Sequence, residues 1–439
     1  MVILLLVPLA GGLFFLLYKS YQAQIENLNQ SKAVTTEFDV PSVNGKLRSF
    51  QRAGVEYLVR NKRAFLADDM GLGKTVQAIA AMEYLQSYPV VVVCPATVKF
   101  NWLNELKKWI PHRSASLIGS NADVIVMSYG EMAKYKTKAK TVVFDECHYL
   151  KNPKSKRTIE AERLAAKSDF VFMLSGTIVV NRARELMSQL KIMRQLHKFG
   201  GEDYFIKAFC RKNSDLNQLQ QMLRSTCMIR RLKSDVLAEL PAKQRSIVEV
   251  DIDNRSEYNR VIKNNGIDIS SLGQLRQIIA DGKMRHGLDW VKDFLETDRK
   301  LVVFAHHRDI QRQIYKAIPN AVRITGDMTS EQRQRSVDEF TNNPDCRVIV
   351  CSLKAAGFGL NLQVASDVFF FELGWTPAEM FQAEDRCHRM NQRNSVNCYY
   401  LIGKDTFDDR MFDLIINKNK DITKLVDSEI KQIFFNNAA

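Results

Sequence analysis

The sequence predicts an α/β fold of two tandem lobes, each built on a parallel sheet. Its 439 residues exceed what one compact hydrophobic core usually holds. Short apolar runs rich in β-branched residues alternate with helix-length amphipathic segments, and this alternation is typical of buried parallel strands joined by helices. The pattern occurs twice, and a helical stretch rich in Gln, Leu, Arg and Lys separates the two occurrences.

The strand-like runs fall into two sets that define the expected domains. The first set is 64–67, 90–94, 124–127, 142–144 and 170–174, and the second is 301–305, 322–325, 348–351 and 368–371. An amphipathic helix at 76–85 is typical of the segments between them. We therefore expect a hydrophobic segment and linker at 1–36, a first lobe at 37–240 with a helical insertion from about 181, a helical linker at 241–290, a second lobe at 291–430 and a tail at 431–439.

Composition and charge narrow the class of protein. Hydrophobic residues make up 46% and charged residues 26%, values that exclude a collagen, a disordered chain and a polytopic membrane protein. The formal net charge of +14 suggests a polyanionic partner such as nucleic acid, although a solvated basic surface gives the same count. Residues 181–250 hold 14 Lys or Arg against 7 Asp or Glu, so the positive excess is concentrated there.

The cysteines argue against a zinc site. There are eight, and the closest pair, Cys346 and Cys351, is too far apart in sequence for a C-x-x-C motif. Several lie inside apolar runs, which predicts buried free thiols and a reducing compartment.

Residues 2–18 differ from the rest of the chain because they carry no charge. Seventeen residues are the lower limit for spanning a bilayer, and Pro8, Gly11 and Gly12 interrupt the run. No Lys or Arg precedes it, unlike in a secretory signal, and Lys19 after it favours a cytoplasmic body. A membrane anchor, a misassigned start codon and a packed leader remain open.

The first chemical motif is a glycine-rich turn between a predicted strand and a predicted helix. It is Asp68-Asp69-Met70-Gly71-Leu72-Gly73-Lys74-Thr75. Glycines let the backbone close around phosphates, and the helix N-terminus supplies N–H donors and a positive dipole. The pattern G-x-x-x-x-G-K-[ST] predicts that Lys74 reaches the β- and γ-phosphates of ATP and that the Thr75 hydroxyl binds Mg²⁺, with Asp68 in place of the first glycine.

A pair of carboxylates follows another predicted strand. Asp145 and Glu146 come directly after the run 142–144, and such a strand brings its last residues to the crevice where nucleotides bind in α/β sheets. Asp145 is expected to hold Mg²⁺, and Glu146 to orient and deprotonate the attacking water. The alternative, a solvated turn, is less consistent with an apolar strand downstream of a phosphate loop.

These two motifs resemble motifs I and II of helicase superfamily two, in the form found in Swi/Snf-type DNA translocases, whose motif I typically begins with Asp-Glu or Asp-Asp. Further segments resemble the family's other motifs in the same order, over about 45–425. They are 47–51 with 54–55, 93–95 with 101–102, 128–129, 174–177 with Asn181 and 185–186, 229–233 with 235–237 and 240–241, 304–306, 352–357 with 359–362, and 382–386 with 388–389 and Gln392. Ile178 and Asn391 depart from the Pro and Gly that the family usually carries there.

The resemblance implies two tandem RecA-like P-loop lobes with a helical, family-specific insertion. It also implies the nucleotide-binding residues, which are Gln51, Asp69, Met70, Gly71, Leu72, Gly73, Lys74, Thr75, Asp145 and Gly359. The implied catalytic residues are Lys74, Glu146, Arg386 and Arg389.

Arg386 and Arg389 are three residues apart, so on a helix they would share one face. Two guanidinium groups aimed at the γ-phosphoryl group would stabilise its developing charge when the lobes close on ATP. The alternative is a salt-bridged surface helix, because Glu384 and Asp385 are adjacent.

The resemblance also implies contacts with DNA, made by hydroxyl and lysine side chains in the family motifs that bind the DNA phosphate backbone. These are Thr97, Ser128, Ser352 and Lys354. Contacts to phosphates position the nucleic acid without reading its sequence, so we expect no sequence specificity. Trp102, Trp290 and Trp375 are predicted to pack in the core or between the lobes rather than to stack on bases.

The leading hypothesis is a DNA-dependent ATPase, with ATP and Mg²⁺ as cofactors, that translocates on duplex or branched DNA. The compact chain resembles the annealing-helicase branch or a phage or bacterial relative, which implies a role in DNA repair or replication-fork remodelling. An RNA helicase of the same superfamily is one alternative, and a nucleotide-regulated scaffold that hydrolyses nothing is another. We expect a cytoplasmic protein associated with the nucleoid or with viral DNA, with an N-terminal membrane contact through 2–18 still open.

Overall fold

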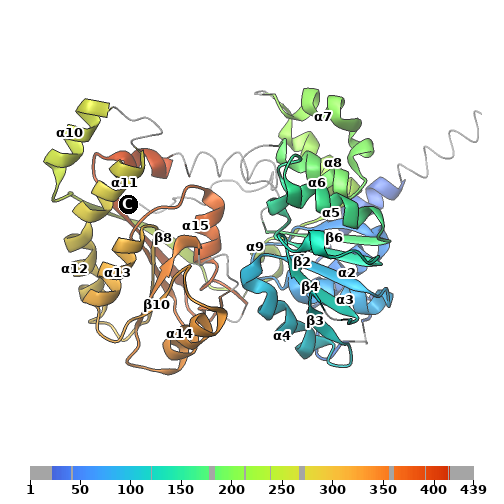
Figure 1. Ribbon diagram of the computed structural model, residues 1–439, viewed down its shortest axis with the longest axis horizontal. Helices are drawn as coiled ribbons and strands as arrows, with labels where there is room; N and C mark the ends of the chain where they lie inside the picture. Colours follow the sequence, from blue (N-terminus) through green and yellow to red (C-terminus); the bar gives the residue numbers. More distant parts are fainter. Residues whose placement is uncertain are drawn as a thin grey trace, which may run out of the picture. The chain divides into compact units, whose positions relative to one another are not determined.

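The computed structural model describes residues 22–415, except 41–42, 120, 177–182, 212–213, 238, 266–271, 355–359, 391 and 414. Contacts between residues divide the chain into two units, of which the first ends at Val236 and the second begins at Leu237 (Figure 1). We predicted this division four residues later, at 240. Each unit contains a parallel sheet with helices packed against it, as the alternating sequence pattern predicts.

The sheet of the first unit has the strand order β3-β4-β2-β5-β6-β1-β7, and all neighbouring strands are parallel. In chain order the strands are β1 (Arg63–Leu66), β2 (Val90–Cys94), β3 (Ala115–Leu117), β4 (Val124–Ser128), β5 (Thr141–Asp145), β6 (Phe170–Leu174) and β7 (Met228–Ile229). The five runs predicted as strands of this lobe are confirmed. Every residue of β2 is buried, because a central parallel strand is covered on both faces.

Helices precede and connect these strands. They are α2 (Ser49–Asn61), α3 (Lys74–Leu85), α4 (Lys99–Trp109) and α5 (Lys156–Ala166). The region predicted as a helical insertion contains α6 (Glu185–Ile192), α7 (Gly201–Phe209) and α8 (Leu216–Thr226), followed by β7 and α9 (Lys233–Val236). In Figure 1, α7 and α8 lie together at one end of the first unit.

The sheet of the second unit has the order β10-β11-β9-β12-β13-β8, again with parallel neighbours. Its strands are β8 (Lys243–Val250), β9 (Leu301–Ala305), β10 (Val322–Ile324), β11 (Val348–Ser352), β12 (Asp367–Phe370) and β13 (Val396–Gly403). Its helices are α10 (Arg255–Asn265), α11 (Leu272–Gly282), α12 (Met284–Phe294), α13 (Arg308–Ala317), α14 (Ser330–Asn342) and α15 (Pro377–Glu384). The four predicted strands of this lobe are confirmed, and their apolar side chains form cores on both faces of the sheet.

The prediction of a helical linker at 241–290 was wrong at its start. Residues Lys243–Val250 form β8, which pairs with β13 over eight residues and belongs to the second sheet. The strand is an edge strand, so its side chains are exposed or only partly buried. Its sequence therefore lacks the continuous apolar run that marks a central parallel strand. The rest of the stretch is helical, in α10, α11 and α12.

Among the described residues, no helix combines the length and the apolar composition that crossing a membrane requires. Residues 2–18 lie outside the described part of the chain, so the expected membrane contact stays a prediction.

Candidate active site

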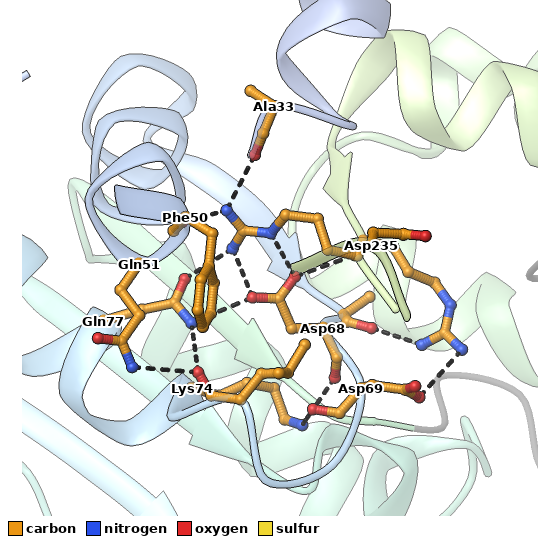
Figure 2. Close-up of polar contacts among 12 residues, drawn as sticks. Ala33, Phe50, Gln51, Asp68, Asp69, Lys74, Gln77 and Asp235 are labelled. Atoms are coloured by element: carbon orange, nitrogen blue, oxygen red, sulfur yellow. Dashed lines mark hydrogen bonds and ion pairs between the residues drawn. The ribbon is translucent and has the colours of Figure 1, made fainter. Parts of the chain in front are cut away.

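The glycine-rich turn leaves the end of β1 and leads into α3, whose first residue is Lys74. Gly71 (φ 81°) and Gly73 (φ 74°) both have left-handed backbone conformations, which glycine adopts without steric cost. The Lys74 Nζ donates hydrogen bonds to the carbonyl oxygens of Asp68 (2.8 Å) and Asp69 (3.2 Å) (Figure 2). Burial lowers the pKa of Lys74, while the nearby carboxylates, Glu146 foremost, act in the opposite direction. A cation held inside such a loop suits a phosphate ligand.

Gln51 contacts the same loop from α2. Its Nε2 donates to the Leu72 carbonyl oxygen at 3.3 Å, and its Oε1 accepts a hydrogen bond from the Arg48 backbone N–H at 3.0 Å. The side chain is buried, so this contact fixes the position of α2 against the loop.

Asp68, in the slot of the first glycine, is fully buried and forms an ion pair with Arg231. Arg231 follows β7, the edge strand next to β1. Arg230 contacts the loop as well, since its Nη1 donates to the Ala67 carbonyl oxygen at 2.6 Å. The sequence places both arginines in a family signature but predicts no role for them at the site, because Arg231 lies 163 residues from Asp68.

The carboxylate pair lies at the carboxyl end of β5, as predicted. Asp145 accepts a 2.8 Å hydrogen bond from the Trp102 Nε1 and a 3.0 Å hydrogen bond from the Glu146 backbone N–H. Burial, together with the charge of Glu146, raises the pKa of Asp145 to about 6. A buried carboxylate whose charge is disfavoured fits a cation, so the chemistry of this group is consistent with Mg²⁺.

Glu146 has a left-handed backbone conformation (φ 52°), so the extended backbone of β5 ends directly before it. The His148 Nδ1 lies 3.3 Å from the Glu146 Oε2, and the Ser175 Oγ donates to the same oxygen at 3.4 Å. Ser175 follows β6, the neighbour of β5, so adjacent strand ends bring these groups together.

Gly176 connects this cluster to the phosphate loop. A Cβ atom at Gly176 would lie 2.7 Å from the Met70 Cγ and 3.4 Å from the Lys74 Nζ, so the backbone passes close to both side chains. The structure therefore brings Gln51, Asp69 to Thr75, Asp145 and Glu146 together in the first unit. Gly359 lies outside the described residues.

Arg386 and Arg389 are in the second unit, and the structure corrects their expected setting. The helix α15 ends at Glu384, so both arginines lie in the turns after it and not on one helical face. Burial, together with the charge of Arg386, lowers the pKa of Arg389 to about 9. Two like charges in a partly buried position favour an anionic ligand.

The surface-helix alternative for this segment is contradicted by burial. Glu384 is fully buried, and its carboxylate binds Lys243 Nζ at 2.9 Å and Arg245 at 2.6 and 2.7 Å. Arg386 is 8% exposed, so this is not a solvated helix.

The residues expected to contact DNA follow the carboxyl ends of strands. Ser128 ends β4, Ser352 ends β11, and Thr97 lies in the short helical turn after β2. The Ser128 Oγ donates to a Glu131 carboxylate oxygen at 2.7 Å, so this hydroxyl already has a structural partner. Lys354 is exposed.

Two of the three tryptophans predicted as core residues are packed. Trp102 is fully buried, and Trp290 stacks on Phe369 with ring centroids 4.2 Å apart. Trp375 is 41% exposed, with Arg276 4.3 Å from its ring centroid, so it is not a core residue, and its packing between the lobes stays a prediction.

In the described parts of the chain no group of three or more His, Cys, Asp or Glu residues could hold a metal ion by protein ligands alone. All eight cysteines are free thiols.

Two parallel-sheet lobes, with a lysine-bearing phosphate loop and an Asp-Glu pair at the strand ends of the first, define the class of two-lobed P-loop nucleotide-binding proteins. The sequence model of the SNF2-related domain matches residues 50–344. The chain belongs to the SNF2-related family.

Several relatives support this assignment. The chain is 34% identical over 454 residues to the Xenopus laevis SWI/SNF-related matrix-associated actin-dependent regulator of chromatin subfamily A-like protein 1, covering 92% of this chain and 47% of that protein. It is 32% identical over 456 residues to the human DNA annealing helicase and endonuclease ZRANB3, covering 91% and 42%. The chain thus spans about half the length of these relatives.

Among solved structures, the Sulfolobus solfataricus SWI2/SNF2 ATPase core in complex with dsDNA matches with a TM-score of 0.47 and 24% identity, covering 90% of this chain and 96% of that one. The family assignment rests on the sequence matches.

Proposed function

We propose that the chain hydrolyses ATP in a DNA-dependent manner and uses the cycle to move along or remodel duplex or branched DNA. The observation that carries the proposal is the cluster formed by Lys74, Glu146, His148 and Ser175 at the strand ends of the first unit. A cation for the phosphates and an oriented carboxylate for water are the two groups that ATP hydrolysis requires from this lobe.

The roles of the residues follow from their chemistry. Lys74 would exchange its bonds to the Asp68 and Asp69 carbonyls for bonds to the β- and γ-phosphates. Glu146, held by His148 and Ser175, would orient the attacking water and accept its proton. Thr75 and Asp145 would hold Mg²⁺, which neutralises phosphate charge when bound.

Arg386 and Arg389 are the candidates for stabilising charge on the transferred phosphoryl group. The burial of Arg386 and the lowered pKa of Arg389 support an anionic ligand at this position. With Gly359 they complete the residues that we assign to the nucleotide from the second unit.

DNA as the partner is supported by the net charge of +14 and by a relative that is named a DNA annealing helicase. We expect contacts to phosphates through Thr97, Ser128, Ser352 and Lys354, without sequence preference. Ser128 would have to share its hydroxyl with Glu131.

We further propose that the protein is cytoplasmic and is associated with the nucleoid or with viral DNA. Membrane contact through residues 2–18 would be tested by fractionating cells that express the chain with and without those residues.

One experiment separates the proposed function from its alternatives. ATP hydrolysis is measured with no nucleic acid and with duplex DNA, forked DNA, single-stranded DNA and RNA, for the parent and for Glu146→Gln. We expect stimulation by duplex or forked DNA in the parent and none in the variant. Stimulation by RNA alone would favour an RNA helicase, and ATP binding without hydrolysis would favour a scaffold.

A further inference from the structure

Asp68 and Arg231 form an ion pair whose two side chains are both 0% exposed. The Arg231 Nε donates to Asp68 Oδ1 at 2.9 Å and its Nη2 donates to Oδ2 at 2.5 Å, in the fork geometry of a guanidinium on a carboxylate. The Arg231 backbone N–H donates to Oδ1 as well, at 3.1 Å. Burying two charges costs free energy, so a buried ion pair of this kind is weak evidence for a gain in stability. A role other than stability is therefore needed to explain why the pair is present.

The same guanidinium contacts three further parts of the first unit, at Ala33, Phe50 and Gln77, which Figure 2 labels. It donates to the carbonyl oxygen of Phe50 in α2, to that of Ala33 at 3.2 Å, and to the Gln77 Oε1 in α3 at 2.9 Å. Gln77 in turn donates to Asp68 Oδ2 at 3.0 Å and to the Leu72 carbonyl oxygen at 3.3 Å. Arg231 thus connects both helices that flank the phosphate loop to the loop itself.

Helix α2 passes close to this cluster at Gly54. A Cβ atom on Gly54, in α2, would lie 1.8 Å from the Gln77 Oε1 and 2.8 Å from the Arg231 Nη2. A side chain at position 54 would displace Gln77 or Arg231, so the close approach of α2 and the hydrogen bonds of the guanidinium together restrict its position.

The position of Arg231 also affects Lys74, through the backbone of Asp68 and Asp69. Lys74 Nζ bonds to the carbonyl oxygens of Asp68 and Asp69. The Asp69 N–H donates to the Arg231 carbonyl oxygen at 3.0 Å, and the Asp69 carboxylate accepts the Lys233 N–H at 3.3 Å. Residues 231–233 therefore hold both of the residues whose carbonyl groups place the Lys74 ammonium group.

We propose that Arg231 is a positioning residue for nucleotide binding. It touches no phosphate, and it acts by holding Asp68 so that the loop is already ordered when ATP arrives. Without it, the loop must be ordered at the expense of binding free energy, which weakens affinity more than it slows chemistry. This inference rests on the proposed function only in that ATP is the ligand of the loop.

The test uses the double variant Asp68→Asn/Arg231→Gln, which removes both charges and leaves no buried ion unpaired. The matched control is Lys283→Gln/Asp408→Asn, which removes another buried ion pair, 2.5 Å long, in the second unit. The dissociation constant for a fluorescent ATP analogue, KM for ATP, kcat and the melting temperature are measured for each. Arg231→Lys, which keeps the charge but not the planar fork, is the second variant.

We expect Kd and KM to rise about tenfold in the double variant, equivalent to about 1.4 kcal/mol, with kcat changed much less. The control should keep the parental Kd and KM at a comparable shift in melting temperature. Arg231→Lys should raise KM in the same direction, and it carries the test if the double variant does not fold. A parental KM in both Arg231 variants, or a fall in kcat at unchanged KM, would overturn the inference. If the parent itself binds no ATP, the proposed function fails instead.

Discussion

The indole N–H of Trp102 donates a 2.8 Å hydrogen bond to Asp145, the residue that ends the central strand β5. Trp102 is fully buried in α4, so the carboxylate is held from the apolar side of the site. Its other oxygen accepts the Glu146 backbone N–H. Burial and the neighbouring Glu146 charge raise the pKa of Asp145 from 3.8 to about 6. The Trp102 hydrogen bond acts in the opposite direction, because it stabilises the charged carboxylate and so lowers this pKa.

Stability without nucleotide should depend on pH through Asp145. Because its pKa is raised in the folded state, its contribution to the free energy of unfolding is present below about pH 4 and is lost as the pH rises through about 6. Relative to Asp145→Asn, the parent should lose on the order of 1–3 kcal/mol of unfolding free energy by pH 7.5. Urea denaturation of both proteins between pH 4 and 7.5, without Mg²⁺, measures this difference. A difference that does not change with pH would contradict the assignment.

Substitutions of Lys74 and of Glu146 should impair ATP turnover in different ways. Lys74→Ala removes the cation of the loop and should weaken both nucleotide binding and hydrolysis. Glu146→Gln keeps the shape of the side chain but not its basicity, so binding should survive while the rate falls by about 10²-fold or more. Nucleotide affinity and steady-state ATP hydrolysis are compared with Lys107→Ala, an exposed lysine on α4. Parental hydrolysis in the Gln variant would show that the mechanism is wrong.

Arg386 and Arg389 should be needed for hydrolysis more than for binding. Each Arg→Ala variant leaves the phosphate loop intact, so ATP affinity should change little, while DNA-stimulated hydrolysis should fall by about 10³-fold. The charge of Arg386 contributes to the lowered pKa of Arg389, so removing one of the two like charges relieves repulsion and the melting temperature should not fall greatly. Arg393→Ala, at an exposed position four residues on, is the matched control. Normal turnover with Arg389→Ala would remove this segment from the catalytic machinery.

Binding to DNA should depend steeply on salt and not on sequence. The logarithm of affinity should fall linearly with the logarithm of salt concentration, with a slope of about 0.9 for each neutralised phosphate on duplex DNA. Titrations of two unrelated duplexes of equal length at several salt concentrations test both parts. A flat salt dependence, or a strong preference for one duplex, would count against the proposal.

The positive excess counted in residues 181–250 overstates what is available to DNA. Arg224, Arg230, Arg231 and Lys233 are buried, and Arg230 and Arg231 bind the first unit internally. Lys198 and Lys207, by contrast, are exposed. Charge counts along a sequence do not distinguish the two groups, because burial depends on residues that are distant in the chain.

The fold was largely predictable, because its central strands have continuous apolar runs. Residues 90–94 and 301–305 coincide with β2 and β9 for this reason. Some strands could not be predicted from the sequence because they are short, such as β7 with two residues, or because they lie at an edge of the sheet, such as β8. β13 has an alternating pattern of buried and partly buried residues at its start and was also missed.

The site was predictable where its chemistry is local in the chain. The loop up to Thr75 and the Asp145-Glu146 pair follow from motifs of adjacent residues. Trp102 and Arg231 could not be assigned, since their partners Asp145 and Asp68 are 43 and 163 residues away. A motif of adjacent residues does not predict which side chain, distant in the sequence, will form a hydrogen bond or an ion pair with it in the folded protein.

The position of β7 beside β1 has a consequence for how the chain is made. β1 pairs with β6 on one side and with β7 on the other, and β7 is synthesised last, at Met228–Ile229. A nascent chain that has emerged only as far as α6 therefore exposes one side of β1 as an open edge, next to an Asp68 that still lacks its arginine. Unpaired edges invite association with other chains, so ribosome-bound intermediates of this length should depend on chaperones until about residue 231 is free.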